Sequence, residues 1–197
     1  VTFSGAPANL VWSGATDNTW EVGGVTNNWL NGFTPDAYLN FDNVTFNDSA
    51  FGPNLSPVLS TVITPGAVTF NNSLNTYDLS GAGGIAGTAK LTKSGTGITT
   101  ISTTNSYTGG TDVLAGNLIV GSGGTTGSLG TGAILVDGNL TFNRSDTVTL
   151  ANTIDGSGTL TQGGFGTLAL TGTQSALCSL VADAGILQIG DGSSNSA

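Results

Sequence analysis

The sequence predicts an all-β protein, and three observations support that prediction. Gly, Thr, Ser and Asn account for 100 of the 197 residues, and these types favour turns or strands over helix interiors. No window shows apolar residues recurring with the period of about 3.6 residues that an amphipathic helix requires. Short apolar pairs instead alternate with polar residues between Gly, Asn and Asp, which is the pattern of short strands joined by tight turns.

Strand-like alternation is clearest after residue 60. The apolar pairs are, in chain order, Val68 and Phe70, Leu118 and Val120, Ile134 and Val136, Leu140 and Phe142, Val148 and Leu150, Leu168 and Leu170, and Leu187 and Ile189. Strands this short suit a solenoid, in which each coil stacks on the previous one at about 4.8 Å. We therefore expect a parallel β-helix. A jelly-roll or Greek-key sandwich is the alternative, because it also uses many short strands bounded by glycine.

The second part of the chain repeats itself at an offset of 69 residues. Ile85 to Gly123 aligns without gaps with Ile154 to Gly192, and 13 of the 39 positions are identical. If the offset corresponds to three coils, each coil has 23 residues, and Thr61 to Gly192 forms about six coils.

The first 60 residues differ in composition from the remainder. They contain all three tryptophans of the chain, Trp12, Trp20 and Trp29. We expect an aromatic-rich cap or lead-in region over residues 1–60 and solenoid repeats over residues 61–197. The tryptophans are expected to form a hydrophobic cap on the first coil, since a solenoid must cover its open end. A platform for glycans is the alternative.

Charge and composition exclude several classes of protein. Three basic residues face 12 acidic ones, for a formal net charge of -9, which argues against nucleic-acid binding. No apolar run reaches the length of a membrane-spanning helix. Without His, and with Cys178 as the single cysteine, no metal or other cofactor is expected. Most aspartates adjoin Gly, Asn or Ser, and we interpret them as turn residues rather than as catalytic groups or calcium ligands.

One segment resembles a known repeat family. Leu91 to Gly121, with the sequence LTKSGTGITTISTTNSYTGGTDVLAGNLIVG, is similar to the autotransporter-associated β-strand repeat, also called the passenger-associated transport repeat. Leu160 to Gly190 forms a degenerate second copy. The resemblance implies a right-handed parallel β-helix on the outside of a bacterial cell, in adhesin-like or structural proteins, without enzymatic activity. A secreted or cell-surface location is therefore expected.

The expected function is that of a self-assembling structural subunit. An uncovered strand edge at each end of the solenoid predicts head-to-tail pairing into a homopolymer, in a cell-surface filament or matrix. The residues expected to pair are Val1, Thr2 and Phe3 at one end and Leu187 and Ile189 at the other. The alternative is an adhesin passenger fragment that binds surface or matrix glycans, and a third possibility is a β-helical enzyme acting on polysaccharides. The chain is expected to be either an excised fragment or a short free-standing protein.

Overall fold

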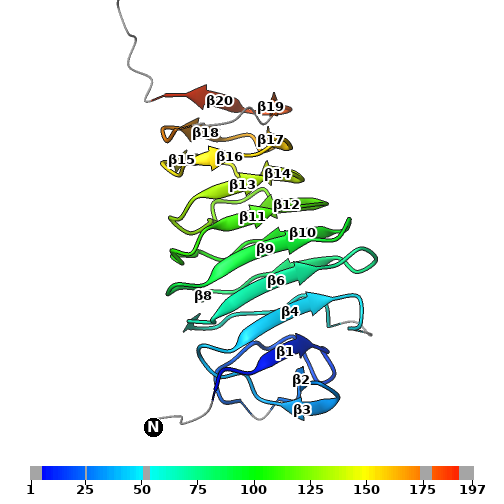
Figure 1. Ribbon diagram of the computed structural model, residues 1–197. Coiled ribbons are helices and arrows are strands. Elements are labelled where there is room, and N and C mark those ends of the chain that lie inside the picture. The colour runs from blue at the N-terminus through cyan, green and yellow to red at the C-terminus, as the bar shows by residue number, and fades with distance from the viewer. Residues whose placement is uncertain (1–5, 25, 51–53, 174–178, 191–197) are drawn as a thin grey trace, which may run out of the picture.

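The computed structural model describes residues 6–24, 26–50, 54–173 and 179–190. All regular structure within these residues is β, and the strands stack from the N-terminal end of the molecule to the C-terminal end (Figure 1). The chain winds as a right-handed β-solenoid with three faces and about seven turns, of which about six follow Thr61, as expected.

Each face is a ladder of strands contributed by successive coils. The first face stacks, in parallel, β1 (Asn9–Trp12), β4 (Asn43–Asn47), β6 (Ala67–Asn71), β9 (Lys90–Ser94), β11 (Thr111–Val113), β13 (Ile134–Val136) and β16 (Ile154–Asp155). The second face stacks, also in parallel, β7 (Tyr77–Leu79), β10 (Ile98–Ile101), β12 (Asn117–Val120), β14 (Asn139–Phe142), β17 (Thr159–Gln162) and β19 (Ser179–Ala182).

The third face is interrupted. Its early coils contribute β5 (Val62–Ile63) and β8 (Gly84–Ile85), and its late coils contribute β15 (Thr147–Leu150), β18 (Thr167–Leu170) and β20 (Ile186–Ile189). The two groups are separate sheets, because the intervening coils cross this face without forming strands.

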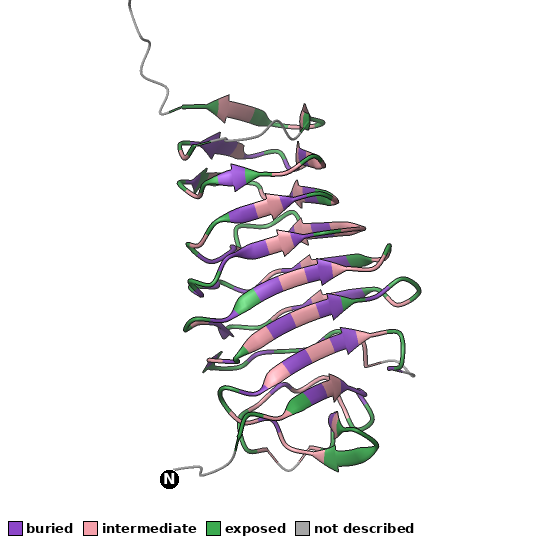
Figure 2. Ribbon diagram, in the orientation of Figure 1, coloured by how far each residue is buried: buried purple, intermediate pink, exposed green. Residues whose placement is uncertain are grey.

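The ladders confirm the predicted fold class and exclude the sandwich. Inward side chains are buried on successive rungs, so the strands of the front face in Figure 2 show alternating buried and partly exposed bands. Phe46 and Phe70, which pair in register, stack with their ring centroids 4.7 Å apart and their planes 13° apart. Identical side chains one coil apart therefore form the continuous internal columns that a solenoid requires.

The coils are shorter and less uniform than the repeat suggests. Residues stacked directly above one another are 19 to 23 positions apart in the repeating part of the chain. Three coils separate Leu91 in β9 from Ile154 in β16, whereas Leu160, the counterpart of Leu91 in the second copy, lies on the second face. The prediction of three 23-residue coils per repeat is wrong, because the offset of 69 residues covers three coils and one further face.

The repeat preserves a corner of the solenoid rather than a face. Lys93 and Gln162 align in the two copies, and both are buried at the strand end before a turn. Lys93 Nζ donates to the carbonyl oxygens of Ser94 and Gly95, at 2.7 and 2.8 Å. Gln162 Nε2 donates to two glycine carbonyls of its own turn, at 2.9 and 3.0 Å. The sequence similarity therefore reflects one turn design that is used at two different corners.

The N-terminal end adds an antiparallel hairpin to the parallel ladder. β2 (Trp29–Asn31) pairs with β1, and β3 (Thr34–Asp36) pairs with β2. On its other side β1 pairs in parallel with β4, so the ladder crosses the boundary that we expect near residue 60. No helix within the described residues is long and apolar enough to cross a membrane.

Candidate binding surfaces

The C-terminal end of the described chain presents two strand edges. Among the described strands, β19 has a ladder partner only in β17, and β20 has one only in β18. Leu187 is partly buried against the core, while Ile189 is 65% exposed. Both residues predicted to pair with a neighbour thus lie on an edge strand. Val1, Thr2 and Phe3, the predicted partners at the other end, fall outside the described residues.

The N-terminal end has a different kind of edge. β3 is the outermost strand of its sheet, and Pro35 lies in its middle, in register with Leu30. Proline has no backbone N–H to donate to a further strand, and proteins use it to protect exposed edges. The two ends of the solenoid are therefore unequal, because backbone pairing is hindered at β3.

The three tryptophans lie together at this end of the solenoid, Trp12 on β1 and Trp29 on β2. Trp12 and Trp20 are fully buried and Trp29 is 2% exposed. The ring centroids of Trp12 and Trp29 are 4.9 Å apart, and each of the three indoles lies within 5.6 Å of the Phe46 ring on β4. A glycan platform needs an exposed aromatic face, so this burial favours packing over the first coil.

The indole N–H groups of the cluster differ in their partners. Trp12 Nε1 donates to Asn54 O at 2.8 Å. Trp20 Nε1 and Trp29 Nε1 are buried without a hydrogen-bond partner. An unpaired buried donor costs about 1–3 kcal/mol, so the cluster gains its stability from the apolar contact area of the rings.

The outer surface of the first face carries a column of residues in direct register, all polar except Leu135. Thr45, Thr69 and Thr92 occupy successive rungs, and the column continues through Asp112 and Leu135 to Asp155. Strand pairing fixes the spacing of the rungs at about 4.8 Å, so the column presents hydroxyl and carboxylate groups at regular intervals. We call Thr45, Thr69, Thr92, Asp112, Leu135 and Asp155 the outer column.

Other outward polar residues bond across coils. Asn43 Nδ2 donates to Asn9 Oδ1 at 3.0 Å on the first face. On the second face, Thr141 Oγ1 donates to Asn117 Oδ1 at 3.2 Å. Such bonds between neighbouring rungs hold the polar side chains in place, which keeps the surface ordered.

Two aspartates hold turns, as the sequence suggests. The carboxylate of Asp48 accepts hydrogen bonds from the backbone N–H groups of Asn75, Leu74 and Ser73 in the next coil. These bonds hold the pKa of Asp48 below its ordinary value, and the bond from Asn75 has the largest effect. Asp42 accepts from Ala8 N at 2.7 Å and from a backbone N–H of its own turn. No group of three or more His, Cys, Asp or Glu side chains that could hold a metal ion occurs among the described residues.

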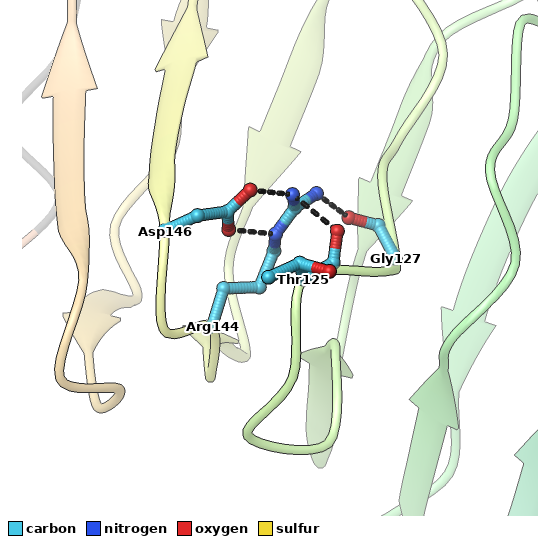
Figure 3. A network of polar contacts seen from close by, with 4 residues as sticks. All are labelled: Thr125, Gly127, Arg144 and Asp146. Carbon is cyan, nitrogen blue, oxygen red and sulfur yellow. Dashed lines mark hydrogen bonds and ion pairs between the residues drawn. The ribbon is translucent and has the colours of Figure 1, made fainter.

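Arg144 fastens an irregular loop on the third face (Figure 3). Its guanidinium donates to the Asp146 carboxylate at 2.8 and 2.5 Å, and to the carbonyl oxygens of Thr125 and Gly127 at 2.6 Å each. The hydrogen bonds from Arg144 lower the pKa of Asp146. Sequence reasoning missed this network, although Arg144 is the only arginine of the chain and lies two residues before an aspartate.

The fold and these surfaces define a class, a repeat-built β-solenoid with a capped N-terminal end and ordered polar faces. Residues 91–120 match the family model described as passenger-associated-transport-repeat. The chain therefore contains a repeat of this family, and the resemblance predicted from Leu91 to Gly121 is confirmed.

A relative of known type matches part of the chain. It is the adhesin BmaC autotransporter of Brucella suis biovar 1 (strain 1330), 44% identical over 88 residues, which cover 43% of this chain and 3% of that protein. The chain therefore corresponds to a small part of the relative's length. No solved structure matches. Autotransporter passengers are secreted or cell-surface proteins, so the expected extracellular location is confirmed.

Proposed function

We propose that this chain is part of an extracellular adhesin passenger and that its polar faces bind surface or matrix glycans. The outer column is the observation that carries the proposal, because it presents hydroxyl and carboxylate groups on a rigid ladder. Sugars are recognised by such hydrogen-bonding groups placed beside apolar surface. The passenger repeat and the adhesin relative support the same class of function, and both favour a non-enzymatic role.

A binding experiment with the whole chain tests this proposal. We expect the purified protein to bind a subset of immobilised glycans and to lose that binding when Thr45, Thr69 and Thr92 are all replaced by alanine. All three side chains are partly exposed on the outer surface, so the triple variant should remain folded. The same replacement at Thr147 and Thr149, exposed on the third face, is the matched control. Equal glycan binding by the triple variant and the wild type would refute a role for the outer column.

Head-to-tail assembly into a filament is the second candidate. The specific observation in its favour is the C-terminal edge, where Ile186 and Ile189 are 59% and 65% exposed on a strand with no second ladder partner among the described strands. β3 is protected by Pro35, so the partner proposed for this edge is the segment Val1 to Phe3, added to it as a further strand.

Electron microscopy distinguishes this candidate from a monomeric adhesin. Under the assembly hypothesis, we expect fibres of uniform width, and we expect Ile189→Lys or deletion of residues 1–3 to abolish them. Ile98→Lys places the same charge at a residue that is 43% exposed on the second face, and should leave fibres intact. Single particles from the wild type at high concentration would rule out assembly by this route.

A further inference from the structure

The outer column leads into a hollow on the first face. The hollow has a volume of about 290 Å³ and is lined by residues of β9, β11, β13 and β16, together with the turn that precedes β11. Its lining includes Gly109, Gly110 and Ala133, which have little or no side chain. It also includes four longer side chains, here called the wall residues: Lys90, Asp112, Leu135 and Asp155. A row of small residues beside longer ones thus creates a depression in an otherwise regular surface.

The register of the strands fixes the spacing of the wall residues. Asp112, Leu135 and Asp155 occupy successive rungs, so the two carboxylates lie on either side of the leucine, about 10 Å apart at the backbone. Leu135 is partly exposed between them. The arrangement combines one apolar side chain with acceptors on both sides, which suits a ligand that has an apolar face and polar groups at its edge.

The charges of the hollow select among such ligands. Lys90 Nζ forms an ion pair with Asp112 Oδ2 at 2.5 Å, so these two charges offset each other. Asp155 is exposed, and the hydrogen bond found for its carboxylate is from the backbone N–H of Gly156 at 2.7 Å. One negative charge therefore remains, on a chain whose formal net charge is -9. A cationic group is attracted and a sulfated or carboxylated group is repelled.

The volume limits the size of the ligand. Sites for drug-sized molecules occupy about 300–1,000 Å³, and this hollow lies just below that range. It has room for a single sugar ring rather than for a folded peptide or an aromatic cofactor. The outer column continues from the hollow toward the N-terminal end through Thr92 and Thr69, so further units of a chain could lie along it.

We propose that this hollow binds one amino-bearing hexose unit of a glycan. The ring lies on Leu135, its ammonium pairs with Asp155, and its hydroxyls bond to Asp112 and Lys90. This inference rests on the proposed adhesin function and deepens it, since it assigns the ligand class and the contacting residues.

Isothermal titration calorimetry of the whole chain with a glucosamine trisaccharide tests the assignment. Ala133→Leu enlarges an exposed side chain that lines the hollow and leaves the charge unchanged, and Asp155→Asn removes the unpaired charge. We expect each variant to bind at least tenfold more weakly than the wild type. Ala151→Leu and Asp183→Asn make the same changes at exposed residues outside the hollow and should bind as the wild type does. A sulfated heparin-type hexasaccharide should bind more weakly than the trisaccharide.

The outcomes separate this inference from the proposed function. Unchanged affinity in Ala133→Leu and Asp155→Asn, or tighter binding of the sulfated probe, overturns the assignment of the hollow as the site of the amino sugar. If the assignment of the hollow fails but the wild type binds other glycans in the immobilised-glycan experiment described above, the adhesin proposal stands without it. Absence of binding to every glycan overturns both. Far-ultraviolet circular dichroism of each variant checks that the solenoid is intact.

Discussion

Lys93 places an ammonium inside the solenoid, and replacing it provides a sharp test of the structure. The side chain is 0% exposed and lies in an internal column, in register with Phe70 on one side and Val113 on the other. Its Nζ bonds two carbonyl oxygens, and no ion pair involves it among the described residues. Burial lowers the pKa of Lys93 from 10.5 to about 8, against a smaller opposing effect of the Asp48 charge.

The lowered pKa predicts how stability depends on pH. Between pH 8 and 10.5 the unfolded chain holds a proton at Lys93 that the folded chain has released, so the free energy of unfolding rises with pH across this window. Below pH 8 the full cost of burying the charge is present. The shift corresponds to a cost of up to about 3 kcal/mol, and contact of the amine with water would reduce it.

Gln162 shows which substitution removes the charge and keeps the hydrogen bonds. It holds the aligned position in the second copy of the repeat, at a different corner of the solenoid, and its amide reaches two turn carbonyls. We therefore expect Lys93→Gln to be more stable than the wild type at pH 7, by about 1–3 kcal/mol. Lys93→Met also removes the charge but takes the hydrogen bonds of Lys93 away from two partly buried carbonyl oxygens, at a cost of up to about 1–3 kcal/mol each. Lys93→Met should therefore be less stable than Lys93→Gln at every pH.

Urea unfolding followed by tryptophan fluorescence at pH 7, 8, 9 and 10 provides the measurement. The tyrosines also titrate at high pH, but they are common to all variants, so the difference between the wild type and Lys93→Gln isolates Lys93. That difference should shrink as the pH rises from 8 to 10. A difference that is constant with pH would refute the buried ammonium. Equal stability of the Gln and Met variants would refute the role of the turn carbonyls.

Four further substitutions have outcomes that follow from local geometry. Phe41 has a φ of 76° and is 68% exposed. Asparagine tolerates this backbone conformation, so Phe41→Asn should raise the free energy of unfolding by about 0.5–1 kcal/mol. An unchanged free energy in urea unfolding would show that the backbone at Phe41 is not strained. Trp12→Phe should be less stable than Trp29→Phe by about 1–2 kcal/mol, because only the change at Trp12 removes a hydrogen bond. The reverse order of stability in the same assay would argue against the geometry of the tryptophan cluster. Arg144→Met should speed amide hydrogen exchange in the loop of residues 122–127 and leave exchange on the first face unchanged. If this loop exchanges at the same rate in the variant and in the wild type, Arg144 does not hold it.

Local patterns in the sequence were sufficient for the fold class and for most of the core. Alternation identified strand pairs such as Leu118 and Val120, and both are fully buried. The same alternation at Leu187 and Ile189 did not lead to full burial, because no described strand lies beyond β20 to cover these residues. Inward direction along a strand is a local property, whereas burial depends on the next coil.

The repeat shows where sequence comparison was misleading. Leu91 and Leu160 align because both precede a turn that is closed by a buried side-chain donor, and that requirement is local. Which face each leucine occupies depends on the summed lengths of all intervening turns, which vary from coil to coil. An identical motif at a constant offset therefore does not imply an identical position in the solenoid.

The sequence by itself determined that this chain is all β, that it coils, and that it contains a passenger-associated transport repeat, because alternation and turn chemistry are properties of neighbouring residues. The tertiary structure alone decided which residues share a surface. Lys90, Asp112 and Asp155 line one hollow although two of them are 65 positions apart, and Arg144 meets a loop that precedes it by two strands. Stacking brings residues together at intervals set by the length of each coil, and no local pattern encodes that length.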